Sequence, residues 1–466
     1  MDCEVIVVGA GIGGLATAAV LAARGINVCL FERQSYVGGC AANFEHLGYT
    51  FEPSFGLYSG WQPGGTYDRL FSELSLNRPE VRLLSPAYIV RLPDQTDVAV
   101  SQNSEQLLAT IQRCFPECAN EAVKFYTQLS DFAQAPDSAL AQQADQATAQ
   151  RLIGTSTRFR RFIDVQLQTF TQRASDACSL LTAAHVLTAP ERGLYEIRGG
   201  AQSVADELAT AVKEKGGIIR LNSPVLRLAY SSDGSAIGVD LLSGERVIAT
   251  RAIISNLTIW DTYGKLIGPS RTPKPLTSQL KTLDAWGVYL LFAVMDESTA
   301  SHLNANHFLI VTDLRESVTY MPDEMQLVVS ISPEWDQKGP TGQRAVTIST
   351  FTHVDEWFSF HQDETAYEEQ DQSALESLWS RLHSAMPEHG DSIEVIETAT
   401  PRTFYETTRR RLGMFGSPTS PAIHHPEILT TPFPNVFMIG DTVSAGSGLE
   451  GVCTSAVALA DRIAPV

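Results

Sequence analysis

At 466 residues, the chain is long enough for two or three hydrophobic cores. Its composition, 44% hydrophobic and 19% charged, is that of an ordinary globular protein. A formal net charge of −19 argues against a nucleic-acid partner, because the chain would repel a phosphate backbone rather than neutralise it.

The chain begins with a predicted buried strand that runs into a glycine-rich turn. Four consecutive β-branched residues, 5–8, form the apolar run expected of a parallel strand buried on both faces. The glycines that follow have the spacing of a phosphate-binding turn, in which glycine permits the tight turn, the approach of a pyrophosphate and close helix packing. A helix from Gly14 to about Arg24 would point its N-terminal amides at that pyrophosphate. The predicted phosphate-binding residues are Gly9, Gly11, Gly13 and Gly14.

A carboxylate closes the next predicted strand, residues 28–31. Glu32 lies eighteen residues after Gly14, near the roughly 20-residue offset at which an acidic side chain binds an adenosine ribose hydroxyl. The glycine turn, set between two strands and followed by this acid, predicts dinucleotide binding. Arg33 and the pair Gly38-Gly39 then continue the motif, where an ordinary nicotinamide-binding fold needs no further glycines.

This extended motif resembles the FAD-binding family that contains amine oxidases, phytoene desaturases, carotenoid isomerases and the Rab escort and GDP-dissociation-inhibitor proteins. The resemblance implies that FAD is the cofactor. It also implies that Arg33, Gly38 and Gly39 lie alongside the phosphates and ribityl chain of the flavin. Residues 44–54 form an alternating hairpin turned at Gly48, and they resemble the segment that follows the glycine pair in carotenoid isomerases and desaturases. Here Glu52 replaces the usual Asp.

From about residue 67 to 189 the pattern is mostly helical. Residues 157–170 have an apolar face and a basic cluster formed by Arg158, Arg160 and Arg161. This pattern fits a helix lying on an anionic membrane, and it also fits a core-facing helix with a solvated charged edge. We expect the core-facing helix.

Residues 192–256 return to the nucleotide-binding part of the chain. We predict a helix capped by Ser203, strands over 218–221 and 225–228, and a hairpin turned at residues 243–244. This order resembles the middle FAD segment of the family. The resemblance implies that Val225 contributes backbone groups to adenine binding.

Residues 270–425 differ, because their strand-like runs have no glycine-rich turns between them. The runs 286–294, 307–312, 326–332 and 345–352 predict an antiparallel or mixed sheet, which a helix over 367–386 would cover. The stretch around 400–416 resembles carotenoid isomerases and retinol saturases. It contains three consecutive arginines, 409–411, for which a solvated turn is an equal alternative to a role in the site.

The C-terminal segment supplies the second half of the flavin pattern. A short strand closes at Gly440-Asp441, and a helix runs from about Val452 to residue 463. In the family that Asp holds a ribityl hydroxyl and the following glycine-rich segment passes close to the isoalloxazine ring. The resemblance therefore implies cofactor binding by Gly440, Asp441, Gly448 and Val452. Glu450 stands where carotenoid isomerases have an uncharged residue, but a helix N-terminus also favours Glu, so we assign no catalytic residue.

The predicted fold class is α/β. A Rossmann-like FAD-binding domain of the glutathione-reductase type is assembled from residues 1–68, 191–268 and 426–466. A second, α+β substrate domain is formed by residues 69–190, which are largely helical, and 269–425, which contain the mixed sheet and a helix.

The resemblance implies an FAD-dependent oxidoreductase that acts on a long apolar isoprenoid or polyene by isomerisation, desaturation or saturation. An amine oxidase is the alternative in another enzyme class. A non-enzymatic lipid chaperone like the GDP-dissociation inhibitors is a further alternative. The intact glycines, with Glu32 and Asp441, argue against the chaperone.

Seven cysteines without a CxxC or Cys/His cluster predict reduced, mostly structural thiols and no metal site. The first strand begins too early for a signal peptide, and the longest apolar runs are far shorter than the ~20 residues of a membrane span. We expect a cytoplasmic protein, soluble or peripherally membrane-associated, whose partner is an apolar small molecule. The sequence predicts no oligomeric state.

Overall fold

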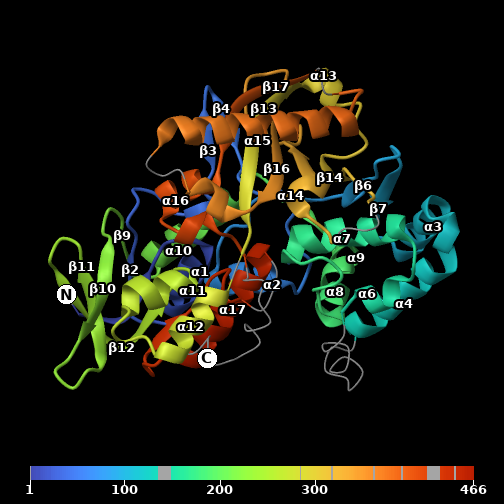
Figure 1. Cartoon of the computed structure of the whole chain (residues 1–466). Coiled ribbons are helices and arrows are strands. Elements are labelled where there is room, and N and C mark those ends of the chain that lie inside the picture. The colour runs from blue at the N-terminus through green and yellow to red at the C-terminus, as the bar shows by residue number, and fades with distance from the viewer. Residues whose placement is uncertain are drawn as a thin grey trace.

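The structure is a computed structural model that describes residues 2–134, 148–283, 285–315, 319–359, 363–389, 392–416, 431–444 and 448–465. The fold contains two seven-stranded sheets and a group of helices (Figure 1). In the view of Figure 1 the first sheet lies at the left, the second at the top and the helical group at the right.

The first sheet has the order β10-β11-β12-β1-β2-β9, with β18 paired to β12. The strands β18, β12, β1, β2 and β9 are parallel, whereas β10 and β11 form an antiparallel extension. The predicted Rossmann-like sheet built from three separate chain segments is therefore confirmed. Its strands are β1 (Asp2–Val8), β2 (Val28–Phe31), β9 (Ile218–Arg220), β10 (Val225–Tyr230), β11 (Ala236–Leu241), β12 (Arg246–Ser255) and β18 (Val436–Met438).

Helices cover both faces of this sheet. On one face α1 packs against α10, α17 and α2, because its Ala and Leu side chains are almost completely buried there. The other face is covered by the segment after β12, where aromatic side chains such as Trp260 and Tyr263 enter the core. The helices are α1 (Ile12–Ala23), α2 (Thr66–Leu74), α10 (Gly200–Glu214), α11 (Ile259–Asp261), α12 (Lys274–Thr282) and α17 (Gly448–Ile463).

The second sheet is mixed, with the order β17-β13-β16-β15-β14-β6-β7. The long helix α15 (Glu364–Ala385) covers one face through Leu378 and Leu382, as predicted. The short α13 (Glu297–Ala300) and α14 (Pro322–Met325) border it, and α16 (Pro401–Thr408) follows its edge strand. The strands are β6 (Tyr88–Arg91), β7 (Asp97–Val100), β13 (Gly287–Asp296), β14 (His307–Val311), β15 (Gln326–Ile331), β16 (Gln343–Thr352) and β17 (Ile393–Ala399).

Residues 67–189 are mostly helical in the structure, as predicted, but they also contain the strands β6 and β7, which were not predicted. β6 pairs in parallel with β14, and β7 continues the sheet. The run 88–91 has strand-like composition but is only four residues long, so its pairing with a strand more than 200 residues away decides its conformation. Two further pairs are β3 (Phe44–His46) with β4 (Tyr49–Phe51), the predicted hairpin, and β5 (Val81–Leu83) with β8 (Tyr195–Ile197).

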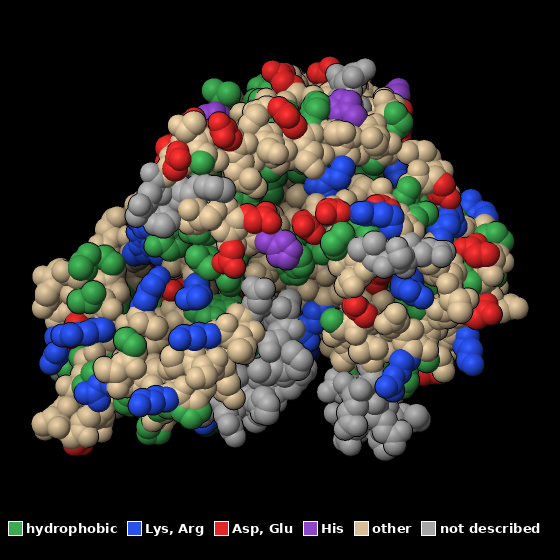
Figure 2. Space-filling model, in the orientation of Figure 1, with side chains coloured by type: hydrophobic (Ala, Val, Ile, Leu, Met, Phe, Trp, Pro, Cys, Tyr) green, Lys and Arg blue, Asp and Glu red, His purple; other side chains and the backbone are tan. Residues whose placement is uncertain are grey.

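The helical group packs around a core of its own. In α7 the apolar side chains Phe159, Phe162 and Leu167 are buried, Arg161 is buried beside Asp164, and Arg158 pairs with Asp94. The helix therefore faces the core, as expected, but its basic cluster is not simply a solvated edge, because Arg161 is buried. Figure 2 shows charged side chains of both signs spread over the face in view. The helices are α3 (Ser104–Cys114), α4 (Ala119–Gln134), α6 (Gln150–Ile153), α7 (Thr157–Thr171), α8 (Leu180–Leu187) and α9 (Ala189–Arg192).

Two local predictions were wrong. Ser203 does not cap its helix: α10 begins at Gly200, and the Ser203 hydroxyl donates to the Gly200 carbonyl inside the first turn. Cys3 and Cys29, predicted to be reduced, form a disulfide between β1 and β2. Within the described residues, no helix has the length and apolar character needed to cross a membrane.

Candidate active site

A cavity of about 1300 Å³ extends from the glycine-rich turn after β1 into the space between the second sheet and the helical group. This volume exceeds the roughly 300–1,000 Å³ of ordinary ligand pockets, so the cavity has room for a dinucleotide and a second molecule. All predicted cofactor-binding residues except Gly14 line it. Their individual roles in cofactor binding stay predictions.

The turn after β1 is built as a phosphate site requires. Gly9 has a φ of +100°, and a Cβ on Gly14 would lie 2.1 Å from the Gly9 carbonyl oxygen, so only glycine fits under the turn. The second glycine pair folds onto this turn, because the Gly38 amide donates to the Ala10 carbonyl at 2.9 Å. The N-terminus of α1 opens at the same place, and its first amides have no partner within the helix. The arrangement fits the pyrophosphate of a dinucleotide.

Glu32 lies beside the turn, at the end of β2. One of its carboxylate oxygens accepts the Ala10 amide and the other accepts the Gln34 amide, both at 2.8 Å. These two bonds hold the carboxylate at the rim of the cavity, where the ribose was predicted. Arg33 lines the same region, and its guanidinium donates to the Thr407 carbonyl. Val225 lines the cavity from the start of β10.

Asn256, which the sequence did not single out, joins the two ends of the chain. It follows the carboxyl end of β12, and its side chain donates to the Gly9 carbonyl at 3.4 Å. A Cβ on Gly13 would lie 2.8 Å from its amide oxygen, and one on Gly440 would lie 3.1 Å from that atom. The N-terminal turn and the C-terminal Gly-Asp therefore lie on either side of one amide. The sequence could have indicated Asn256, because it is a polar residue at the carboxyl end of a central strand, where ligands bind in such sheets.

Asp441 forms a bidentate ion pair with Arg410, the middle residue of the arginine triplet. The Arg410 guanidinium donates to the two carboxylate oxygens at 3.2 and 2.6 Å, and the Gly416 amide donates to one of them at 2.9 Å. Arg409 and Arg411 are exposed, but Arg409 also lines the large cavity, so the solvated-turn alternative describes Arg411 alone.

The far part of the cavity is mainly apolar. Its walls come from the second sheet and from the helical group, and they include Phe170, Val186, Leu194, Leu290 and Phe351. Polar side chains interrupt this lining at a few positions. Glu450, at the start of α17, is one of them, and its carboxylate lies 3.4 Å from the Thr66 hydroxyl.

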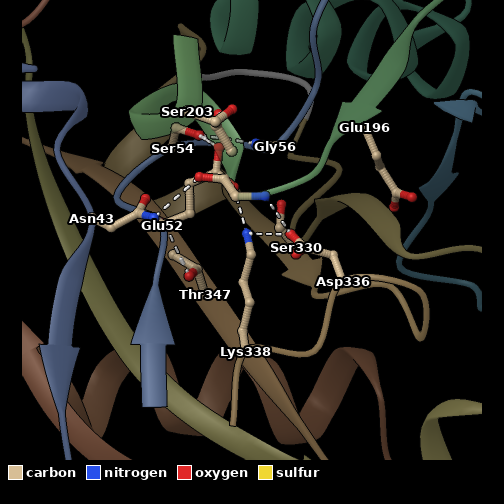
Figure 3. Close-up of polar contacts among 12 residues, drawn as sticks. Asn43, Glu52, Ser54, Gly56, Glu196, Ser203, Ser330, Asp336, Lys338 and Thr347 are labelled. Carbon is tan, nitrogen blue, oxygen red and sulfur yellow. Dashed lines mark hydrogen bonds and ion pairs between the residues drawn. The ribbon is translucent and has the colours of Figure 1, made fainter. Parts of the chain in front are cut away.

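A second, small cavity of about 40 Å³ lies behind the loop of residues 52–58, which also lines the large cavity. Figure 3 shows Lys338 reaching Glu52 at this place, with Ser54 and Asp336 beside them. Lys338 donates to Glu52 at 2.9 Å and lies 3.5 Å from Asp336. Ser54 donates to the other Glu52 oxygen at 2.9 Å and contacts the Tyr58 hydroxyl at 3.1 Å.

The same cavity is bordered by a buried histidine. His307 lies 3.2 Å from a carboxylate oxygen of Glu196, and a Cβ on Gly56 would lie 2.8 Å from its ring. Burial alone would raise the pKa of Glu196, but hydrogen bonds from His307, Asn306 and Trp335 lower it below its ordinary value. The sequence offered no motif for these charges, since their partners are far apart in the chain.

Comparisons with known proteins agree with this geometry. The family described as flavin containing amine oxidoreductase matches residues 12–464. The chloroplastic prolycopene isomerase of Daucus carota is 23% identical over 99% of this chain and 80% of its own length. The all-trans-retinol 13,14-reductase of Homo sapiens is 23% identical over 97% of this chain and 85% of its own length. Among solved structures, putrescine oxidase bound to putrescine has a TM-score of 0.68 at 18% identity, covers 99% of both chains and shares the fold.

Proposed function

We propose, from the premise that this chain belongs to the family of flavin-containing amine oxidoreductases, that it acts on a long apolar isoprenoid or polyene. Its cofactor is FAD. When bound, FAD supplies hydride and electron transfer at its ring, and the protein contributes binding, orientation and the exclusion of water. The reaction is a cis–trans isomerisation, a desaturation or a saturation.

The observation that carries this proposal is the apolar extension of the large cavity beyond the cofactor residues. Side chains such as Phe132, Leu181, Pro190, Val288 and Leu290 line it from two separate parts of the chain. An apolar chain that enters this space would gain about 25 cal/mol of binding free energy for each Å² of apolar surface removed from water. It would need no polar partner in the protein to do so. The names of the curated relatives, an isomerase of prolycopene and a reductase of retinol, support the same substrate class.

An amine oxidase is the second candidate. Glu450 lines the cavity, and its carboxylate would offer a counter-charge to a substrate ammonium. A non-enzymatic lipid chaperone is the third candidate, and the fit of the glycine-rich turn to a pyrophosphate argues against it.

The discriminating experiment incubates the purified protein anaerobically with carotenoids and retinoids, with the flavin oxidised and reduced. An isomerase gives a product of unchanged mass, a saturase consumes two electrons from reduced flavin for each double bond removed, and a desaturase delivers two electrons to oxidised flavin for each one formed. Oxidation of amines with peroxide release, and no conversion of any polyene, would contradict the proposal. A colourless protein that binds prenyl groups would favour the chaperone.

Two alanine variants test whether turnover depends on the bound cofactor: Gly14→Ala is the test variant, and Gly25→Ala is its matched control. The Cβ added at position 14 collides with the Gly9 carbonyl, so the test variant should bind no FAD and show no turnover. Gly25→Ala introduces the same atom at a glycine where nothing lies within 4 Å. It should keep both FAD and activity, since the cost of its positive φ acts on stability alone.

A further inference from the structure

Arg410 is a mostly enclosed cation that lines the large cavity. It lies two residues after the end of α16, and its side chain is 13% exposed. Besides the two bonds to Asp441, its Nε donates to the Met414 carbonyl at 2.8 Å, and its guanidinium lies over the Phe415 ring. These contacts fix the guanidinium from several directions, so the charge is held in place rather than left on a flexible stem.

The position of this charge relates it to the phosphate turn. Arg410 Nη1 lies 4.0 Å from Cys40 Sγ, and Cys40 directly follows the pair Gly38-Gly39. A Cβ on Gly39 would lie 3.2 Å from the Cα of Gly11, so the glycine pair packs on the turn where a pyrophosphate fits. Arg410 is therefore separated from the phosphate turn by one layer of backbone.

The electrostatics of this end of the cavity are unfavourable for a polyanion. The chain carries a net charge of −19, and two carboxylates, Glu32 and Asp441, line the same end of the cavity. A bound pyrophosphate adds about two negative charges to this region, and like charges at close range in a partly buried site repel strongly. The N-terminus of α1 compensates for part of this charge, since a helix end supplies roughly half a positive charge.

We propose that Arg410 is a cofactor-positioning residue that cancels the charge of Asp441. With the pair intact, the carboxylate is oriented toward the cavity and its charge does not oppose the phosphates of FAD. The inference concerns the FAD site and does not depend on the identity of the substrate.

The test measures the FAD affinity of the full chain, by titrating deflavinated protein and following the flavin fluorescence. Arg410→Met leaves Asp441 uncompensated and should raise the Kd for FAD at least about tenfold. Arg411→Met removes the same charge from the exposed neighbour and should change the Kd by less than about twofold. Circular dichroism of each deflavinated variant checks that the fold is retained.

Repeating the substitution in the Asp441→Asn variant distinguishes charge cancellation by Arg410 from a purely structural role of its side chain. In Asp441→Asn there is no carboxylate charge to cancel, so adding Arg410→Met should change the Kd by less than about threefold. Arg410→Lys keeps the charge and should remain close to the parent chain. If Met at position 410 prevents folding, Arg410→Gln takes its place in both backgrounds.

Three results would overturn the proposal. They are an unchanged Kd in folded Arg410→Met, an equal loss of affinity in both backgrounds, and a loss in Arg410→Lys as large as that in Arg410→Met. None of these readouts requires turnover, so a failure here is distinguishable from a failure of the proposed substrate class.

Discussion

Two ion pairs, Asp441–Arg410 and Glu52–Lys338, join residues that are far apart in the chain, and the two pairs differ in what borders them. Asp441 and Arg410 line the large cavity, and the carboxylate side chain is 31% exposed to it. Glu52 and Lys338 are 12% and 8% exposed, and Asp336 adds a second carboxylate beside the lysine. The first pair lines the cavity in which we expect FAD to bind, whereas the second is enclosed by protein. We therefore expect changes in the first pair to alter FAD affinity and changes in the second to alter folding stability.

The largest expected effect is that of Lys338→Met on stability. Removing one partner of a buried ion pair leaves an uncompensated charge, which costs about 3–5 kcal/mol in the free energy of unfolding. Urea denaturation of the deflavinated protein measures this loss. Arg82→Met is the control, because the side chains of Arg82 and its partner Glu80 are 53% and 43% exposed and exposed pairs contribute only a small fraction of that free energy.

Lys338→Met also tests the expected difference between the two ion pairs. The FAD affinity of folded Lys338→Met should stay within about threefold of the parent chain, since distant and independent sites act additively. A large loss of FAD affinity with unchanged unfolding would show that the enclosed pair acts on the cofactor and that the distinction between the two pairs is wrong.

A smaller effect is expected for Glu196→Gln, and it depends on pH. The pKa of Glu196 is lowered from 4.5 on folding, so its ionised form stabilises the fold above about pH 4.5. That contribution is lost as the pH falls through the lowered pKa. The variant should cost about 1–3 kcal/mol at neutral pH, and the difference should shrink in acid.

Unfolding curves at neutral pH and below pH 4 measure this difference. Glu368→Gln, at an exposed position of α15, is the control and should leave both curves unchanged. A stability difference that grows on acidification would contradict the assignment of the buried carboxylate.

The smallest effect is expected at the apolar end of the cavity, where neither ion pair lies. Ala189 lines this end at the start of α9. Replacing it by Phe narrows the space and should lower kcat/KM for a long polyene about tenfold, with less effect on a shorter one. Equal losses for both lengths, measured with one polyene series, would show that this wall does not limit substrate length.

The sequence was most informative about the site at residues that both set the local backbone conformation and serve the predicted cofactor site. Gly14 must be glycine because of the carbonyl beneath it, and Glu32 must end a strand, so both leave a readable spacing in the chain. Asp441 was predicted from the family resemblance instead, and it lines the same cavity as Glu32. The exact division of the chain at residues 68, 190, 268 and 425 stays a prediction.

The remaining parts of the site depend on contacts that no local pattern encodes. Lys338 is an ordinary loop lysine until the fold places it against Glu52, and Arg410 becomes distinct from its two neighbours only because the turn after α16 directs it inward. The strand β6 was missed for the same reason, since its partner β14 lies in a distant part of the chain. These features are set by tertiary packing and not by propensity.

The ladder between β6 and β14 has a mechanical consequence. Residues 89–91 are joined in register to residues 308–310, so the segment leading into the helical group is a member of the same sheet that forms the opposite wall of the cavity. An outward movement of the helical group that carried β6 with it would break the hydrogen bonds between β6 and β14. The start of the helical group is therefore tied by backbone hydrogen bonds to the sheet on the other side of the cavity.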